Sequence, residues 1–448
     1  MNKFEELREK YPVFNYDGYK INKNKDTIDI EYNFSIDNLD SFKTNWTIPY
    51  KEKNTKMLLG ANTIEKEEQI LNKLVFSLGL VEAISYYKLT CAKEVNVKCG
   101  TLTNSQAKFF KKLFYKGLGE FMFINNINIS LDDFFKLNYE ETNEKPISDP
   151  GSYKNALVPV GGGKDSCVTL EMIQNNSYVT TFAINPNETI KNVIKASEIT
   201  RNINVDRKLD PKIIEYNAKG FLNGHTPFSA MVAFSSFLTA YLNSIKYITL
   251  SNESSANEST VKDSFINHQY SKSLEFENDF IEYIKTVTDS DIHYFSYLRM
   301  MNEIEIAKFF SQNSKYFKVF RSCNKGSKKG IWCCDCAKCL FVYIILSPFI
   351  KEETLIEIFG KKVLDNPNLE EDFKGLIGVN ENKPFECVGT REEVAAALKV
   401  YISNHSSLLT DKYKDYILSL KGRSLEELAV EETNNHNVPD KFKVIRVV

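Results

Sequence analysis

A glycine-rich segment near the middle of the chain has the residue types and spacing of a phosphate-binding loop. It consists of Gly161, Gly162, Gly163, Lys164, Asp165 and Ser166. The segment follows a β-rich run at 156–160 and precedes a helical pattern at 166–174. Glycines tolerate positive φ angles and amides at a helix N-terminus attract anions, so the segment predicts a phosphate site. Asp165 after the lysine excludes a Walker A loop; the alternative is a tight turn in which this acid complements the helix dipole.

Four cysteines in the pattern C-x9-C-x2-C-x2-C form a second chemical motif. They are Cys323, Cys333, Cys336 and Cys339. Closely spaced thiolates can share one ion, and tetrahedral zinc binds four of them, so the spacing predicts a structural zinc site. Cys334 is left over and is expected to pack as a small apolar residue. Unliganded buried cysteines and a redox-active pair are the alternatives.

Candidate acid and base residues lie in polar segments outside these motifs. His225 follows an Asn-Gly turn and precedes a predicted helix start at Pro227, which places its imidazole at the carboxyl edge of the predicted sheet. His268 lies in a polar run without apolar periodicity. Imidazole titrates near neutral pH, so both are candidate bases. A solvated or capping histidine remains the alternative for each.

Other polar residues are candidates for supporting roles. Glu253 follows a predicted strand and could hold Mg²⁺ or orient a base, and Asn252 could contact a nucleotide; a loop acid and a turn cap are the alternatives. Cys387 is a candidate second acid or base, because a nearby cation lowers the pKa of a thiol, with simple burial as the alternative. Lys272 could bind a phosphate or a carboxylate, with a surface lysine as the alternative, and Glu386 could bind one end of a substrate, with an ordinary salt bridge as the alternative.

The elements that position these residues fall into three predicted parts. We expect an α+β domain in residues 1–148, a doubly wound parallel α/β sheet in residues 149–348, and a mainly helical region in residues 349–448. Ligands of such sheets bind beyond the carboxyl ends of the strands, where the glycine loop lies. We expect the C-terminal region to close over this site with Glu386 and Cys387.

Composition bounds the class of protein and its partners. The 57 basic and 59 acidic residues give a net charge of −2, which argues against a chain that neutralises nucleic-acid phosphates. The charged N-terminal segment lacks a signal-peptide core, and the apolar run 339–350 is shorter than the roughly 18 to 20 residues of a membrane span. Clustered cysteines suit a reducing compartment. We expect a cytoplasmic protein without a membrane or nucleic-acid partner.

Several motifs resemble those of known families. The glycine loop resembles the SGGxDS loop of the PP-loop (HUP-like) ATP pyrophosphatases, with Gly161 where that family usually has Ser. In such a chain the cysteine spacing is similar to that of the 7-cyano-7-deazaguanine synthases. Four further segments together resemble the MurL-type UDP-N-acetyl-α-D-muramoyl-L-alanyl-L-glutamate epimerases. They are 223–229 (NGHTPFS), 251–257 (SNESSAN), 267–273 (NHQYSKS) and 383–389 (KPFECVG). With the glycine loop, this resemblance covers most of residues 150–395.

This resemblance implies an activity, cofactors and site residues. The activity is ATP- and Mg²⁺-dependent inversion of the terminal L-glutamate of UDP-N-acetylmuramoyl-L-alanyl-L-glutamate, a peptidoglycan precursor, through an acyl-adenylate. The loop and Asn252 would bind the nucleotide. Substrate contacts would come from Asn267, Tyr270, Lys272 and Glu386. Another carboxylate-adenylating PP-loop synthase or ligase, and a nucleotide-binding regulatory module without turnover, are the alternatives.

Overall fold

The computed structural model describes residues 2–50, 61–257, 270–326, 329–386, 388–430 and 433–443. Its contacts divide the chain into two compact units, each assembled from separate stretches of sequence. The first unit comprises Met1–Lys154, Ile203–Ile248 and Tyr270–Tyr294, and the second comprises Asn155–Asn202, Thr249–Gln269 and Phe295–Val448. The three-part division of the sequence at residues 148 and 348 stays a prediction, since segments of sequence and contact units are different divisions.

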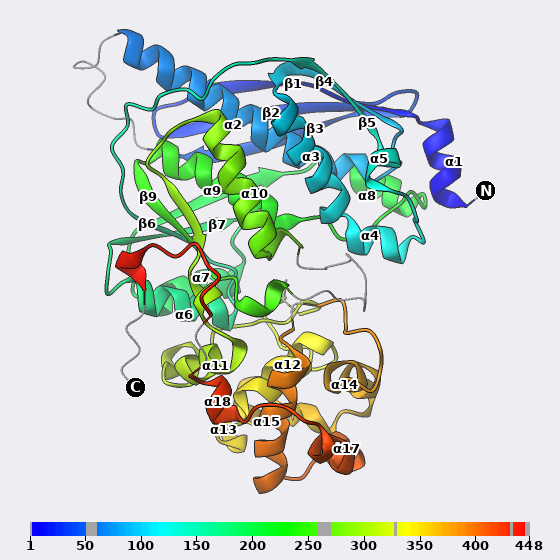
Figure 1. Cartoon of the computed structure of the whole chain (residues 1–448), viewed down its shortest axis with the longest axis vertical. Coiled ribbons are helices and arrows are strands. Elements are labelled where there is room, and N and C mark those ends of the chain that lie inside the picture. Colours follow the sequence, from blue (N-terminus) through cyan, green and yellow to red (C-terminus); the bar gives the residue numbers. More distant parts are fainter. Residues whose placement is uncertain are drawn as a thin grey trace. The chain divides into compact units, whose positions relative to one another are not determined.

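The strands form a mixed sheet of ten strands in the order β10-β9-β6-β7-β8-β3-β2-β1-β4-β5 (Figure 1). Their bounds are β1 Val13–Lys23, β2 Thr27–Ile36, β3 Asp40–Pro49, β4 Glu94–Leu102, β5 Lys136–Glu141, β6 Lys154–Pro159, β7 Val179–Ile184, β8 Asn202–Lys208, β9 Ile245–Leu250 and β10 His293–Ser296. Strands β6 and β7 pair in parallel, as do β1 with β4 and β4 with β5.

The sheet also has an antiparallel part, which the sequence analysis did not predict. Strand β2 is antiparallel to β1 and β3, and β3 is antiparallel to β8. Short turns join β1, β2 and β3, and strands joined in this way can only run in opposite directions. The prediction of a doubly wound parallel sheet is therefore confirmed only as a mixed α/β sheet.

Helix α2 (Ala61–Tyr87) is a core helix of the first unit. It packs against β1, β2 and α9 (Phe228–Leu242). Its stretch Thr63–Tyr87 is long and apolar enough to cross a membrane by length and composition, and 89% of its most apolar window is buried inside the protein. Burial on all sides explains that composition in a core helix. The unit also contains α1 (Lys3–Lys10), α3 (Asn104–Gly117), α4 (Gly119–Ile124), α5 (Leu131–Phe134), α8 (Lys212–Ala218) and α10 (Leu274–Val287).

The second unit is built around helix α12 (Ala337–Leu346), in which every residue is buried. This confirms the expectation of a buried helix in the apolar run that begins at Cys339. Helix α12 packs against α11 (Glu303–Ser311), α14 (Glu370–Ile377) and α15 (Arg391–Asn404), and α11 packs against α6 (Lys164–Ile173). The helical C-terminal region is confirmed as well, and appears in yellow to red in Figure 1. It also contains α13 (Glu352–Phe359), α16 (Leu408–Lys412), α17 (Lys414–Ser419) and α18 (Leu425–Leu428), while α7 (Glu188–Ala196) follows β7.

Candidate functional site

The glycine loop joins β6 to α6 in the second unit and is open on one side. Gly162 has a φ of +84°, and a Cβ at this position would lie 2.9 Å from Cγ2 of Thr189. Gly161 is exposed, with no neighbouring atom within 4 Å of the position of a Cβ. Gly163 is the N-cap residue of α6 and provides no side-chain cap. The loop therefore requires glycine at position 162, and an anion can approach its backbone at Gly161.

A distant segment of the sequence holds the loop in place. The backbone N–H of Arg321 donates a 2.9 Å hydrogen bond to the carbonyl oxygen of Gly162. The backbone N–H of Lys164 donates to Oγ of Ser322 at 3.4 Å. A Cβ at Gly163 would lie 2.8 Å from the same hydroxyl oxygen. Residues 321 and 322 directly precede the first cysteine of the cysteine motif, and sequence reasoning missed their part in this loop.

The side chain of Lys164 points into the protein. It is fully buried and pairs with two carboxylates, Asp165 at 2.5 Å and the fully buried Glu303. Burial alone would lower the pKa of this ammonium, but Asp165 and Glu303 outweigh burial and raise the pKa. Burial raises the pKa of Glu303, with Asp165 and Glu253 adding to the effect and Lys164 opposing it. One ammonium cannot neutralise two carboxylates, so an excess of buried negative charge is part of the cause of the raised pKa of Glu303.

Glu303 connects this group to the start of α15. Its backbone N–H donates to Oε1 of Glu393 at 2.6 Å. The other carboxylate oxygen of Glu393 accepts bonds from the backbone N–H and the hydroxyl of Thr390, at 2.7 and 2.8 Å. Glu393 is buried, and burial raises the pKa of its carboxyl. The sequence analysis assigned no role to Glu303 or Glu393, since a glutamate in the first turn of a helix is ordinary.

Asn252 and Glu253 follow β9, as predicted, and are held by the last residue of β10 and by the turn that follows this strand. The amide of Asn252 donates to Oγ of Ser296 at 2.9 Å. Glu253 is buried, its carbonyl oxygen accepts a 2.6 Å bond from the guanidinium of Arg299, and its carboxylate accepts a 3.3 Å bond from Ser255. Through its effect on Glu303, Glu253 belongs to the same buried charge cluster as Lys164. The structure thus brings two predicted residues, Lys164 and Asp165, into direct contact, and the charge of Glu253 acts on their partner Glu303.

The four cysteines of the motif converge in the second unit. The sulfur atoms of Cys323, Cys333, Cys336 and Cys339 all lie within 4.8 Å of one another. Backbone N–H groups of Gly326 and Asp335 donate to two of these sulfurs, at 3.0 and 3.3 Å. Four converging thiols with supporting amide donors fit a tetrahedral metal ion such as zinc. Cys334 lies outside the set and is buried, with its thiol 3.2 Å from the carbonyl oxygen of Phe359.

Glu386 lies beside this cysteine cluster. Its carboxylate accepts a hydrogen bond from the backbone N–H of Lys338, in the first turn of α12. A carboxylate at this place satisfies a helix amide and complements the helix dipole. The role of Glu386 in substrate binding stays a prediction. Cys387, the next residue, lies outside the described residues, as do Asn267 and His268.

His225 belongs to the first unit, where Glu120 is its acidic neighbour. Nδ1 of His225 lies 3.6 Å from Oε2 of Glu120. The preceding turn is held by Lys88, whose ammonium donates to Oδ1 of Asn223 at 3.2 Å and to the carbonyl oxygen of Gly224 at 2.9 Å. Burial, assisted by the positive charge of Arg207, lowers the pKa of Lys88 to about 8. A histidine paired with a carboxylate has its orientation fixed, as an acid or base requires.

Tyr270 and Lys272 also lie in the first unit, in a short 3₁₀ turn before α10. Tyr270 is buried, its hydroxyl is 3.5 Å from Asp279, and burial raises the pKa of the phenol. The ammonium of Lys116 lies 5.7 Å from the centre of its ring. These contacts account for the position of Tyr270 within the unit, and the predicted substrate contacts of Tyr270 and Lys272 stay predictions.

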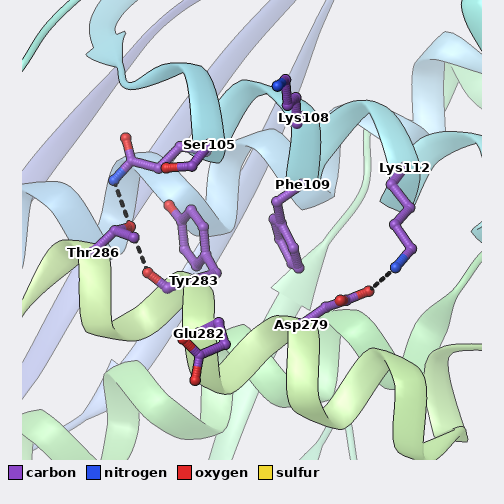
Figure 2. A pocket seen from close by; sticks show the side chains of 9 residues that line it. Ser105, Lys108, Phe109, Lys112, Asp279, Glu282, Tyr283 and Thr286 are labelled. Atoms are coloured by element: carbon purple, nitrogen blue, oxygen red, sulfur yellow. Dashed lines mark hydrogen bonds and ion pairs between the residues drawn. The ribbon is translucent and has the colours of Figure 1, made fainter.

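A cavity of about 380 Å³ lies between α3 and α10 of the first unit (Figure 2). Two pairs of its polar groups bond to each other: Lys112 with Asp279 at 2.5 Å, and the amide of Gln106 with the hydroxyl of Thr286 at 2.9 Å. The aromatic rings of Phe109 and Tyr283 lie between these two pairs (Figure 2). No residue predicted for the site lines this cavity, and we assign no chemistry to it.

Comparison with known proteins identifies a family. The model of the MurL N-terminal domain matches residues 5–297, and the model of the MurL C-terminal domain matches residues 319–422. No solved structure matches the chain.

Curated relatives agree with the family models. Three of them are named UDP-N-acetyl-alpha-D-muramoyl-L-alanyl-L-glutamate epimerase. The protein from Salinispora tropica is 34% identical over 74% of this chain and 73% of its own length. That from Xanthomonas oryzae is 30% identical over 73% of this chain and 74% of its own length, and that from a Micromonospora species is 33% identical over 74% and 75%. Two adjoining family models and three relatives of similar length lead to one conclusion: the chain belongs to the MurL family.

Proposed function

We propose that this chain is an ATP-dependent epimerase that inverts the terminal L-glutamate of UDP-N-acetylmuramoyl-L-alanyl-L-glutamate to D-glutamate. The observation that carries the proposal is the 34% identity over 74% of the chain to a relative named for this epimerisation. The substrate is a small nucleotide-sugar peptide of peptidoglycan precursor synthesis, and we place the enzyme in the cytoplasm.

Activation by ATP solves the chemical problem of this inversion. Removing the Cα proton of a glutamate would place an enolate beside a full carboxylate charge. If a carboxylate oxygen attacks the α-phosphorus of ATP and displaces pyrophosphate, the resulting acyl-adenylate has lost that charge and can delocalise the carbanion. Reprotonation from the opposite face followed by hydrolysis releases AMP and the inverted carboxylate.

We assign the nucleotide to the glycine loop, as in the PP-loop ATP pyrophosphatases. The exposed Gly161, the positive φ of Gly162 and the uncapped start of α6 support this assignment. The partly exposed carboxylate of Asp165 is a hard oxygen ligand that suits Mg²⁺ bound with the phosphates. We assign structural zinc to the four converging cysteines, where it would fix the segment that precedes α12.

Inversion needs an acid or base on each face of the substrate carbon, or one group that moves. His225 is our first candidate, because Glu120 can orient its ring and stabilise its protonated form. His268 and Cys387 are the candidates for the opposite face. Asn252 is assigned to the nucleotide, Glu253 to orientation of the site, and Asn267, Tyr270, Lys272 and Glu386 to the rest of the substrate.

The test is an assay of the purified, zinc-containing protein with ATP, Mg²⁺ and UDP-N-acetylmuramoyl-L-alanyl-L-glutamate in D₂O. We expect pyrophosphate and AMP, together with D-glutamate that carries deuterium at Cα after hydrolysis of the product. Undeuterated L-glutamate without pyrophosphate would refute the proposal. Product formation that requires ammonia or an amine would instead indicate a carboxylate-adenylating synthase or ligase related to the 7-cyano-7-deazaguanine synthases.

A further inference from the structure

The ammonium of Lys164, in the glycine loop, is already paired and is not accessible to a phosphate. It is fully buried and forms ion pairs with two carboxylates, those of Asp165 and Glu303. A phosphate that bound this ammonium would have to compete with both carboxylates, and that of Glu303 is itself fully buried. The second oxygen of Glu303, Oε1, is buried and accepts no hydrogen bond in the described structure. Among the described residues, Lys164 is the one hydrogen-bond donor to the carboxylate of Glu303.

Glu303, the partner of Lys164, also contacts the end of the segment 383–390, which contains the predicted substrate residue Glu386 and the predicted acid or base Cys387. The backbone N–H of Glu303 donates a hydrogen bond to the carboxylate of Glu393. The same carboxylate accepts hydrogen bonds from the backbone N–H and the hydroxyl of Thr390. Gly389 packs tightly here, because a Cβ on it would lie 2.8 Å from Oε2 of Glu393 and 3.0 Å from Cγ of Glu303. The ammonium of Lys383 donates to the carbonyl oxygen of Gly389 at 3.3 Å. The end of this segment at Gly389 and Thr390 thus lies against Glu303 and Glu393, and Lys383 connects the other end to Gly389.

We propose that Lys164 and Glu303 are a positioning pair, which fixes the glycine loop against α11 and against the segment 383–390 without contacting the nucleotide. Lys164 orients the loop by pairing with both Asp165 and Glu303. Backbone amides of the loop then bind the phosphates. The inference rests on the proposed function, since it assigns the parts of the proposed nucleotide site.

The charges of the group predict an unusual pattern of variants. Lys164→Met leaves two carboxylates facing each other, so Glu303 must take up a proton or move, and the loop shifts with it. Glu303→Gln leaves Lys164 balanced by Asp165. The double variant leaves only Asp165 charged, and its side chain is 24% exposed, so water can solvate it. Glu303→Gln should therefore suppress the defect of Lys164→Met, whereas no substitution of Glu303 could replace a lysine that binds phosphate.

The experiment measures KM for ATP and kcat, by pyrophosphate release with the muramoyl dipeptide, for wild type, both single variants and the double variant. Direct calorimetric titration with ATP accompanies the kinetics. The control is Lys191→Met, which removes an exposed ion pair with Glu188 on α7 of the same unit. We expect Lys164→Met to raise KM for ATP at least about tenfold and the double variant to return it to within about threefold of wild type. Lys191→Met should stay within about threefold as well, whereas Glu303→Gln, whose amide oxygen can still accept a hydrogen bond from Lys164, should raise KM less than Lys164→Met does.

The possible results separate the inference from the proposed function. An active wild type whose double variant is as impaired as Lys164→Met would overturn the positioning role and make Lys164 a nucleotide contact. If Lys164→Met loses thermal stability but its KM for ATP does not change, the pair has only a structural role, and this result would also overturn the inference. If Lys164→Met alone does not fold, the KM of the double variant still decides. A wild type that neither binds ATP nor releases pyrophosphate would refute the proposed function first.

Discussion

Charged side chains of the second unit are buried in groups. Lys164, Glu303 and Glu393 are almost completely inaccessible, and each has a charged or backbone partner within hydrogen-bond distance. An unpaired charge in such surroundings costs several kcal/mol, so substitution of Lys164 alone is expected to be far more harmful than substitution of Lys164 together with Glu303. The glycine loop depends on this group for its position and on its own backbone for its shape.

Backbone shape can be tested at two neighbouring glycines. Gly162→Ala forces a side chain into the left-handed region and against Thr189, so we expect it to lower the free energy of unfolding by about 1–3 kcal/mol. Gly161→Ala adds the same methyl group in open space at an exposed position, and should change stability by less than about 0.5 kcal/mol. Urea unfolding of both variants checks this, and equal losses would contradict the difference in backbone conformation and free space between the two positions.

Lys88 predicts a dependence of stability on pH. Its pKa is lowered to about 8 by burial and Arg207, so between pH 8 and its unfolded pKa near 10.5 the unfolded chain binds more protons, and stability rises with pH. At pH 7 the charged Lys88 side chain opposes folding by roughly 1–3 kcal/mol. Lys88→Met removes this unfavourable contribution but also loses the hydrogen bonds to Asn223 and Gly224.

The measurement compares urea unfolding of wild type and Lys88→Met from pH 7 to pH 9.5. Wild type should gain stability relative to Lys88→Met as the pH rises above 8. The difference in stability between wild type and the exposed control Lys191→Met should not change with pH, because both contain Lys88. A difference that does not change with pH would contradict the lowered pKa of Lys88.

At the scale of elements, helix α12 organises the second unit. Two motif cysteines lie at its start, Cys336 as N-cap and Cys339 in its first turn, and its buried residues pack against α11, α14 and α15. A metal ion on the cysteines would therefore tie the segment after Arg321, which holds the glycine loop, to this central helix.

This connection predicts the effect of removing one thiol. Cys333→Ser should reduce bound zinc at least about tenfold, since serine is a poor zinc ligand, and should lower the midpoint of thermal unfolding. Cys334→Ser is the matched control, because Cys334 is buried next in sequence but lies outside the cluster and can keep its bond to Phe359. Metal analysis by mass spectrometry checks both, and equal zinc contents in the two variants would contradict the assigned ligands.

Elements with a local signal were predictable from the sequence, and contacts between distant segments were not. The glycine loop, the cysteine spacing and the apolar run of α12 each lie within a short stretch and were found. Strand β8 was missed, because only Ile203 and Val205 are apolar among its seven residues and its pairing with β3 joins segments far apart in the sequence. Glu303 and Glu393 are separated by 90 residues, so only folding reveals that they meet.

At the scale of the whole molecule, the near-balance of charge predicts how the enzyme meets its substrate. A chain with a net charge of −2 has no broad positive field to attract a polyanion, so binding must rest on local contacts that salt screens weakly. We expect kcat/KM for the muramoyl dipeptide to change less than about threefold between 50 and 200 mM KCl, whereas a protein that contacts six to ten nucleic-acid phosphates loses about 10³–10⁵ in affinity over the same range. Steady-state kinetics at several KCl concentrations, with sucrose as a control for osmolality, measure this directly. A loss of a hundredfold or more would contradict a small-molecule substrate bound by local contacts and favour a nucleic-acid partner, as an adenylating ligase acting on tRNA would require.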